Sequence, residues 1–273
     1  MFERWREPLR EEITMTEWPP EIGFAQWQGT REFQNDVGFI SGYDSERGIL
    51  MALADGIGLD ATAGQAAANA VTAMRQDYEQ ATVLPEMSHQ VVRMLGAAHG
   101  AIRSLNDRLQ EQGEPPTGAT LACTLIRHRR LCFGSIGNVR VFLLRGGCLL
   151  QLNRDHLLSL EAEERNILSG NASDVDPEWA MRVTAYAGMD GLRQLDWQRG
   201  SIPLLADDLV ILMSSGLYGV LSEAELTELL LSDVPQNAAE AVIGRVVHAS
   251  NPASQSNVSL MALRMNSRRR RHV

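Results

Sequence analysis

The sequence predicts an α+β fold, in which strands follow one another in antiparallel series and helices are inserted in pairs. Strand-like runs up to residue 57 are followed by two amphipathic segments, at residues 61–78 and 87–109, with apolar residues at helical spacing. Four short strand-like runs then share "TGATLACTLIRHRRLCFGSIGNVRVFLLRGGCLLQLN", which indicates a meander. Strands and helices do not alternate as they would in a βαβ fold.

The remaining elements are predicted from turns and caps. "EWPPEIGFAQWQGTREFQNDVGFISGY" indicates strands broken by turns, and "GILMALADG" indicates a strand closed by an Asp-Gly turn. Residues 161–168 and 238–249 are helix candidates. "DDLVILMSSG" and "SNVSLMALRM" are predicted strands, and the helix in "SEAELTELLLS" begins with a capping box of Ser222 and Glu225.

Composition limits the class of protein. The chain has 273 residues and a formal net charge of -9, which argues against a nucleic-acid binder. The arginines at positions 268–271 are the exception, and residues 267–273 are expected to form a basic, disordered tail. We find no signal peptide and no apolar run long enough to span a bilayer, so we expect a cytoplasmic protein.

The three cysteines are expected to be structural. Cys123, Cys132 and Cys148 lie in apolar strand-like runs, are odd in number and lack CxxC spacing. Reduced thiols in the core are therefore predicted for all three, rather than disulfides or metal ligands.

The stretch "LADGIG", residues 53–58, brings a carboxylate to a sharp glycine turn. In one interpretation, the turn aims Asp55 and the carbonyl of Gly56 at a metal ion. In the other, Asp and Gly are present because turns favour them.

Seven landmarks in order, from about Arg31 to Met265, decide between these interpretations. They are "REFQND", "LADGIG", "TGATLACTLI", "GSIGNVRVFLLRGG", "LNRDH", "DDLVILMSSGLYGVLS" and "SNVSLMAL". Together they resemble the metal-dependent Ser/Thr protein phosphatases of the PPM, or type 2C, family, with this chain a divergent bacterial-type member. The resemblance implies a four-layer αββα sandwich, formed by a single domain over residues 1–266.

The resemblance also implies a metal site. Family members hold two Mn²⁺ or Mg²⁺ ions, whose bound water attacks phosphoserine or phosphothreonine. Asp55 matches the family's bridging aspartate and Gly56 the glycine whose carbonyl is a ligand. Asp36 matches the acid that orders metal-bound water. Arg31 matches the phosphate-binding arginine, a role that suits the forked guanidinium group.

The chain departs from the family pattern at four positions of this site. Ser215 replaces the acid of the family's "SDG", Ser256 that of "DN" and Asn138 that of "GD", while Asn35 stands where Glu is usual. We therefore expect a degenerate site that holds at most one Mn or Mg ion, at Asp55, Gly56 and Asp36, and no stable dinuclear centre. No residue is assigned as catalytic.

Other acidic residues are not expected to replace the lost ligands. Asp60, Asp207, Asp208 and Glu223 have the positions of turn or cap residues. Asp155 and His156 match a strand-end signature of the family and are expected to be structural.

Two functions from different classes follow. The first is a pseudophosphatase, with weak or no activity, that binds a phosphoprotein, a Ser/Thr kinase or another regulatory partner in signalling. The second is an active but atypical Mn- or Mg-dependent phosphatase with a reduced ligand set. A purely structural subunit also fits the fold, although no sequence feature favours it.

Overall fold

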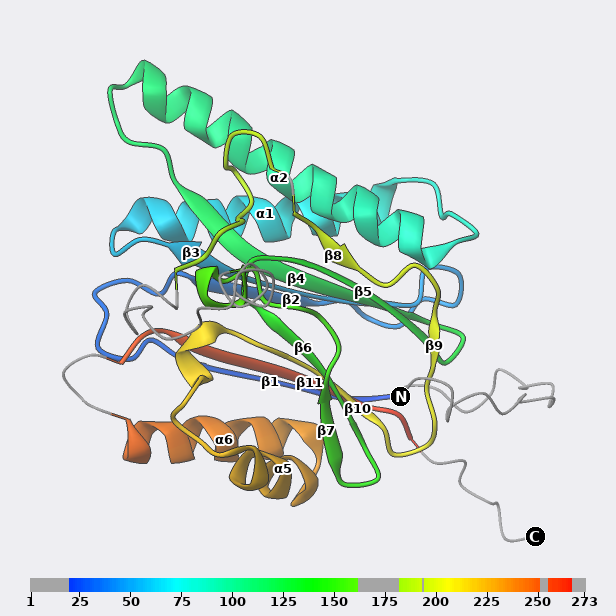
Figure 1. Cartoon of the computed structure of the whole chain (residues 1–273). Coiled ribbons are helices and arrows are strands. Elements are labelled where there is room, and N and C mark those ends of the chain that lie inside the picture. The colour runs from blue at the N-terminus through cyan, green and yellow to red at the C-terminus, as the bar shows by residue number, and fades with distance from the viewer. Residues whose placement is uncertain (1–19, 162–181, 193, 251–254, 267–273) are drawn as a thin grey trace, which may run out of the picture.

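Two antiparallel sheets lie face to face, and a pair of helices covers the outer face of each sheet (Figure 1). This arrangement appears in a computed structural model that describes residues 20–161, 182–192, 194–250 and 255–266. The predicted αββα sandwich is thus confirmed.

The first sheet is covered by the helices α1 (Ala61–Gln80) and α2 (Met87–Glu111). Its strand order is β2-β3-β4-β5-β8, and β9 also pairs with β5. The strands are β2 (Asp36–Ile40), β3 (Ile49–Ile57), β4 (Gly118–Arg127), β5 (Arg130–Ile136), β8 (Asp196–Trp197) and β9 (Ile202–Pro203). All pairings in this sheet are antiparallel.

The second sheet is covered by α5 (Glu223–Leu231) and α6 (Pro235–Ala249). Its strand order is β1-β11-β10-β6-β7. The strands are β1 (Glu21–Trp27), β6 (Arg140–Arg145), β7 (Cys148–Gln151), β10 (Leu209–Met213) and β11 (Val258–Arg264). A short 3₁₀ helix, η2 (Ser215–Leu217), follows β10.

The predicted meander over residues 117–153 is wrong as a single sheet. Its first two strands, β4 and β5, belong to the first sheet, and its last two, β6 and β7, belong to the second. The chain crosses between the sheets at Gly137, whose φ of 96° lies in the region that glycine alone adopts readily. The short link that resembled a hairpin turn therefore connects the two layers.

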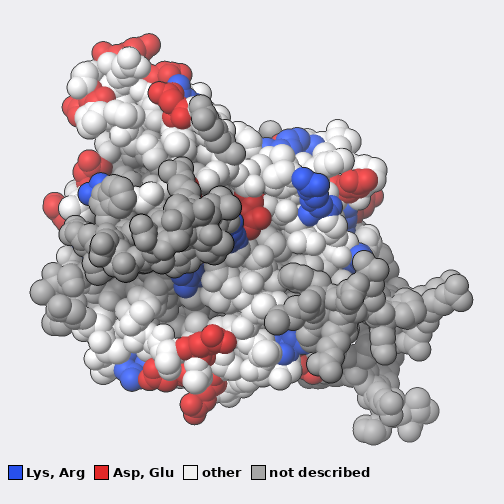
Figure 2. All heavy atoms as spheres, viewed as in Figure 1, with Lys and Arg blue, Asp and Glu red and all other residues white. Residues whose placement is uncertain are grey.

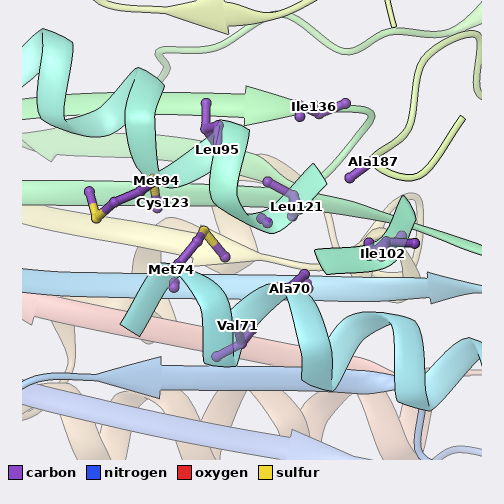
Figure 3. Packing of buried hydrophobic residues seen from close by; sticks show 14 of the residues in the cluster. Ala70, Val71, Met74, Met94, Leu95, Ile102, Leu121, Cys123, Ile136 and Ala187 are labelled. Carbon is purple, nitrogen blue, oxygen red and sulfur yellow. The ribbon is translucent and has the colours of Figure 1, made fainter. Parts of the chain in front are cut away.

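Three layers of apolar side chains fill the sandwich, one between the sheets and one under each helix pair. In the layer under α1 and α2, Met74 and Met94 lie beside Cys123 and Leu121 of β4 (Figure 3). The apolar side chains of both helices point at the sheet because they recur at helical spacing. This packing places α1 on β3 and β4, and α2 on β4 and β5.

The cysteine prediction is correct for two residues and wrong for the third. Cys123 and Cys132 are buried free thiols, whereas Cys148 is free but exposed. Cys148 begins β7, an edge strand in which exposed and half-buried residues alternate, so its side chain falls on the solvent side.

The capping box is present at the start of α5, where Ser222 and Glu225 bond each other's backbone. The helix expected at 161–168, apart from Glu161, and the basic segment at 267–273 lie outside the described residues. Among the helices that the structure describes, none is both long and apolar enough to cross a membrane.

Candidate functional site

Two aspartates face each other across the pair of strands β2 and β3. Asp36 opens β2 and is the antiparallel partner of Asp55, near the end of β3. Asp36 is 2% exposed, and Asp55 is partly buried. The pair lies at the end of the sandwich where β3 leads into α1, on the left in Figure 1.

Two serine hydroxyls from the second sheet bind this pair. Ser214 Oγ donates a hydrogen bond of 2.7 Å to Asp36 Oδ2, and Ser215 Oγ donates one of 2.8 Å to Asp55 Oδ2. Ser214 Oγ in turn accepts a bond of 2.9 Å from the Ser259 N–H of β11. The end of β10 therefore presents two successive hydroxyls to two carboxyl groups.

The surroundings of the pair favour protonated carboxyl groups. Burial, and then the negative charge of Asp55, raise the pKa of Asp36 to about 8, although the Ser214 hydroxyl opposes the shift. Burial also raises the pKa of Asp55, against the hydrogen bond from Ser215. Two carboxylates this close do not both ionise readily without a cation.

Two glycines allow the backbones of the site to approach closely. A Cβ on Gly56 would lie 2.1 Å from the carbonyl oxygen of Ala63 in α1. A Cβ on Gly216 would lie 2.0 Å from the carbonyl oxygen of Asn257. Contacts of this length exclude any side chain at either position, so both turns depend on glycine.

Asn35 and Asn257 hold the loops around the pair. The Asn35 N–H donates to Asn257 Oδ1 at 2.8 Å, and the Asn257 amide group donates to the carbonyls of Gln28 and Phe33. The Asn35 amide group donates to the carbonyls of Gly58 and Asp60. The network ties the loop before β2 to the loop before β11 and to the turn after β3.

Two buried acceptor oxygens of this region have no hydrogen-bond partner among the described residues. They are Asn35 Oδ1 and Asp36 Oδ1. A buried oxygen without a donor is costly, and a proton, a water or a cation would satisfy it.

The other predicted site residues, Arg31, Asn138 and Ser256, are related to the aspartate pair in different ways. The positive charge of Arg31 is close enough to lower the pKa of Asp55. Asn138 is buried, and its carbonyl accepts a hydrogen bond from the Tyr218 hydroxyl. Among the described residues, the Ser256 side chain has no hydrogen bond to either aspartate. The structure thus joins Ser215 and Asp55 directly, but not Ser256.

A stacked group beside the site fixes the crossover loop. The Arg140 guanidinium lies 3.6 Å from the centre of the Tyr218 ring and donates two hydrogen bonds to Asp155 Oδ2. His156 Nδ1 accepts from the Gly137 N–H at 3.0 Å. Asp155 therefore pairs with the first residue of β6, and His156 with Gly137 in the loop between β5 and β6.

The acids considered as replacement ligands have other partners. Asp60 caps α1 through the N–H groups of Thr62 and Ala63. Asp208 precedes β10, at the opposite end of that strand from Ser214, and forms an ion pair with Arg145 of β6. Asp207 is exposed in the turn before β10, and Glu223 is exposed in the first turn of α5. In the part of the chain that the structure describes, no three His, Cys, Asp or Glu side chains are grouped closely enough to hold a metal ion.

The sequence did not assign roles to Ser214, Tyr218 or Arg140. Ser214 stood in the "SSG" stretch that was compared with the family's motif, so the serine pair was a usable signal. Tyr218 and Arg140 are distant in sequence and meet only because β6 and β10 are neighbours in the second sheet.

The chain is similar to known phosphatases both in sequence and in fold. The protein phosphatase PhpP of Streptococcus pneumoniae is 25% identical over 235 residues, which cover 85% of this chain and 92% of PhpP. The PPM Ser-Thr phosphatase MsPP of Mycobacterium smegmatis, solved with cacodylate, superposes with a TM-score of 0.71 at 21% identity, over 90% of this chain and 98% of MsPP.

The catalytic domain of the phosphatase PstP, solved with two manganese ions, superposes with a TM-score of 0.70 at 21% identity. The match covers 91% of this chain and all of that domain. No protein-family profile matches the chain. The sheets, the helix pairs and the PhpP match identify the chain as a homologue of the PPM-type Ser/Thr phosphatases.

Proposed function

We propose that this chain is a PPM-type pseudophosphatase, which keeps the phosphatase fold and has lost the dinuclear metal site. The observation that carries the proposal is the bond between Ser215 and Asp55, since a neutral hydroxyl lies where the family resemblance expects a third carboxylate. Two divalent ions bring four positive charges, whereas Asp36 and Asp55 together supply two negative ones. The donor set does not fit a two-metal centre.

The hydroxyl groups also replace what a metal ion would otherwise provide. Each serine satisfies one buried carboxyl oxygen at normal hydrogen-bond length. The pair is consequently stable as a protonated, hydrogen-bonded cluster without a cation. A pseudophosphatase of this kind acts by binding, and Arg31 is the group that would receive a phosphoserine or phosphothreonine of a partner protein.

Turnover is the direct test of this proposal. Wild-type protein should hydrolyse a phosphothreonine peptide barely above background in Mn²⁺, and the Asp55→Ala variant should match it. Robust Mn²⁺-dependent turnover that disappears in Asp55→Ala would reject the proposal.

Binding is tested separately, with the same peptide under conditions without turnover. Arg31→Gln should weaken binding roughly tenfold, the usual scale for one charged phosphate contact. Arg245→Gln is the matched control, because Arg245 is an exposed arginine of α6 that pairs with Glu225. Equal binding by both variants would remove the role assigned to Arg31.

One observation favours the second candidate, an atypical phosphatase with a single ion. Asp36 Oδ1 is buried without a hydrogen-bond partner among the described residues, and a divalent cation would satisfy it together with the Asp55 carboxylate. This candidate predicts one Mn²⁺ bound per chain in calorimetry and loss of that binding in Asp36→Asn.

A further inference from the structure

A basic cavity lies at the opposite end of the first sheet from the aspartate pair. It has a volume of about 480 Å³ and is lined by Arg127, Arg130, Arg199, His128 and Ser201, together with the first residues of α2. Thr120, the strand partner of Asp55, and Arg127 stand near opposite ends of β4, roughly 23 Å apart at the usual rise per residue. The two sites are therefore separate.

Basic side chains gather at this end of the molecule. In Figure 2 they lie at the right, over the beginning of α2 and the segment between β8 and β9, next to acidic side chains. In a chain with net charge -9, three arginines around one cavity are a local excess of positive charge. The one acid in the lining, Glu86, lies 3.6 Å from His89.

The three guanidinium groups are held in place by neutral partners. Arg127 donates to the carbonyls of Leu84 and Pro85, and Arg130 donates to the hydroxyl and carbonyl of Ser201. Arg199 lies 5.7 Å from the ring centre of Trp197. None of the three forms an ion pair with a carboxylate among the described residues, so their charges remain available to an anion.

Two features of the backbone add to the positive character of the cavity. No side chain caps the beginning of α2, which is 25 residues long, so its first N–H groups and its dipole favour an anion. His128 and Arg129 form the two-residue turn between β4 and β5 with φ values of 50° and 57°. Such turns favour Asn-Gly, so the backbone here is strained, and the turn places His128 in the lining of the cavity.

We propose that this cavity binds a small molecule through its phosphate groups. Forked guanidinium groups fix phosphate oxygens in pairs, and three of them suit a ligand with more than one negative charge. The volume falls within the range of about 300–1,000 Å³ that is typical of small-molecule sites. The site is independent of the proposed function, since it uses neither the aspartate pair nor Arg31.

The test uses calorimetry of the full chain with pyrophosphate and, in a second arm, inorganic phosphate, with EDTA present. The wild type should bind pyrophosphate more tightly than phosphate. The double variant Arg130→Gln, Arg199→Gln should bind pyrophosphate about tenfold or more weakly, because two charged contacts are lost. Both arginines are exposed, so the variant should fold, as circular dichroism would show.

Arg245→Gln on α6 is the control, and it should bind pyrophosphate as the wild type does. Two results would overturn the proposal. These are no binding by the wild type at millimolar pyrophosphate, or unchanged binding by the double variant.

Discussion

Ser215 Oγ lies 2.8 Å from Asp55 Oδ2, so the first residue of η2, just after β10 of the second sheet, donates a hydrogen bond to a carboxyl group of the first sheet. The two residues come from different layers of the sandwich, and their bond spans the end where the layers meet. A change of charge at residue 215 should therefore change the pKa of Asp55 directly.

A carboxylate at residue 215 should make the fold dependent on metal. In EDTA, the free energy of unfolding of Ser215→Asp should be roughly 1–3 kcal/mol lower than that of the wild type, because a third acid joins a buried pair. Mn²⁺ should restore the loss. Combining it with Ser256→Asp should raise Mn²⁺ affinity further, as calorimetry would measure. A wild type with two tight Mn²⁺ sites would contradict this prediction.

The stability of the metal-free protein should depend on the protonation of Asp36. Its pKa is about 8 in the folded protein, against an ordinary value of 3.8, so the folded state keeps a proton that the unfolded chain has released. The free energy of unfolding should therefore fall as the pH rises from about 4 to about 8.

The Asp36→Asn variant has no titratable group at this position, and its amide oxygen can still accept the hydrogen bond from Ser214. At pH 8 in EDTA, the variant should be more stable than the wild type by a few kcal/mol, since one pKa unit corresponds to about 1.4 kcal/mol. Near pH 4 the two proteins should be alike. Parallel profiles from urea unfolding at several pH values would show the idea to be wrong.

Gly56 should tolerate no side chain. In Gly56→Ala the new Cβ would meet the Ala63 carbonyl at 2.1 Å, and the backbone of β3 or α1 must move. A loss of about 3 kcal/mol is expected in thermal unfolding. Gly100→Ala is the matched control, because nothing lies within 4 Å of its Cβ and it is inside α2. It should gain about 0.5–1 kcal/mol.

The thiols should separate into one reactive and two inert groups. Burial raises the pKa of Cys123 to about 12 and that of Cys132 to about 11, whereas Cys148 is exposed. A thiol reagent at neutral pH should add once to the native protein and three times to the unfolded chain. Loss of the single native addition in Cys148→Ser would identify the site.

Most elements of the fold could be predicted from local patterns in the sequence. The helices at 61–78 and 87–109 and the capping box at Ser222 were predicted to within two residues, because period and capping are properties of neighbouring residues. The division of the strands between two sheets was missed, since a crossover at Gly137 and a hairpin turn have the same local sequence signs. The directions of the Ser214 and Ser215 side chains were missed as well, because their carboxyl partners, Asp36 and Asp55, lie in the other sheet and far away in the sequence.

The order β1-β11-β10 has a consequence for how the second sheet assembles. The first described strand, β1, has a single neighbour, β11, the last described strand, and Glu21 pairs with Arg264. The pairing therefore joins two strands that are far apart in the sequence. The entropic cost of closing so long a loop makes this pairing slow. During synthesis, β1 must wait for nearly the whole described chain, whereas β2, β3, β4 and β5 can already pair among themselves. A chain cut short before Val258 would leave β1 without a strand to join.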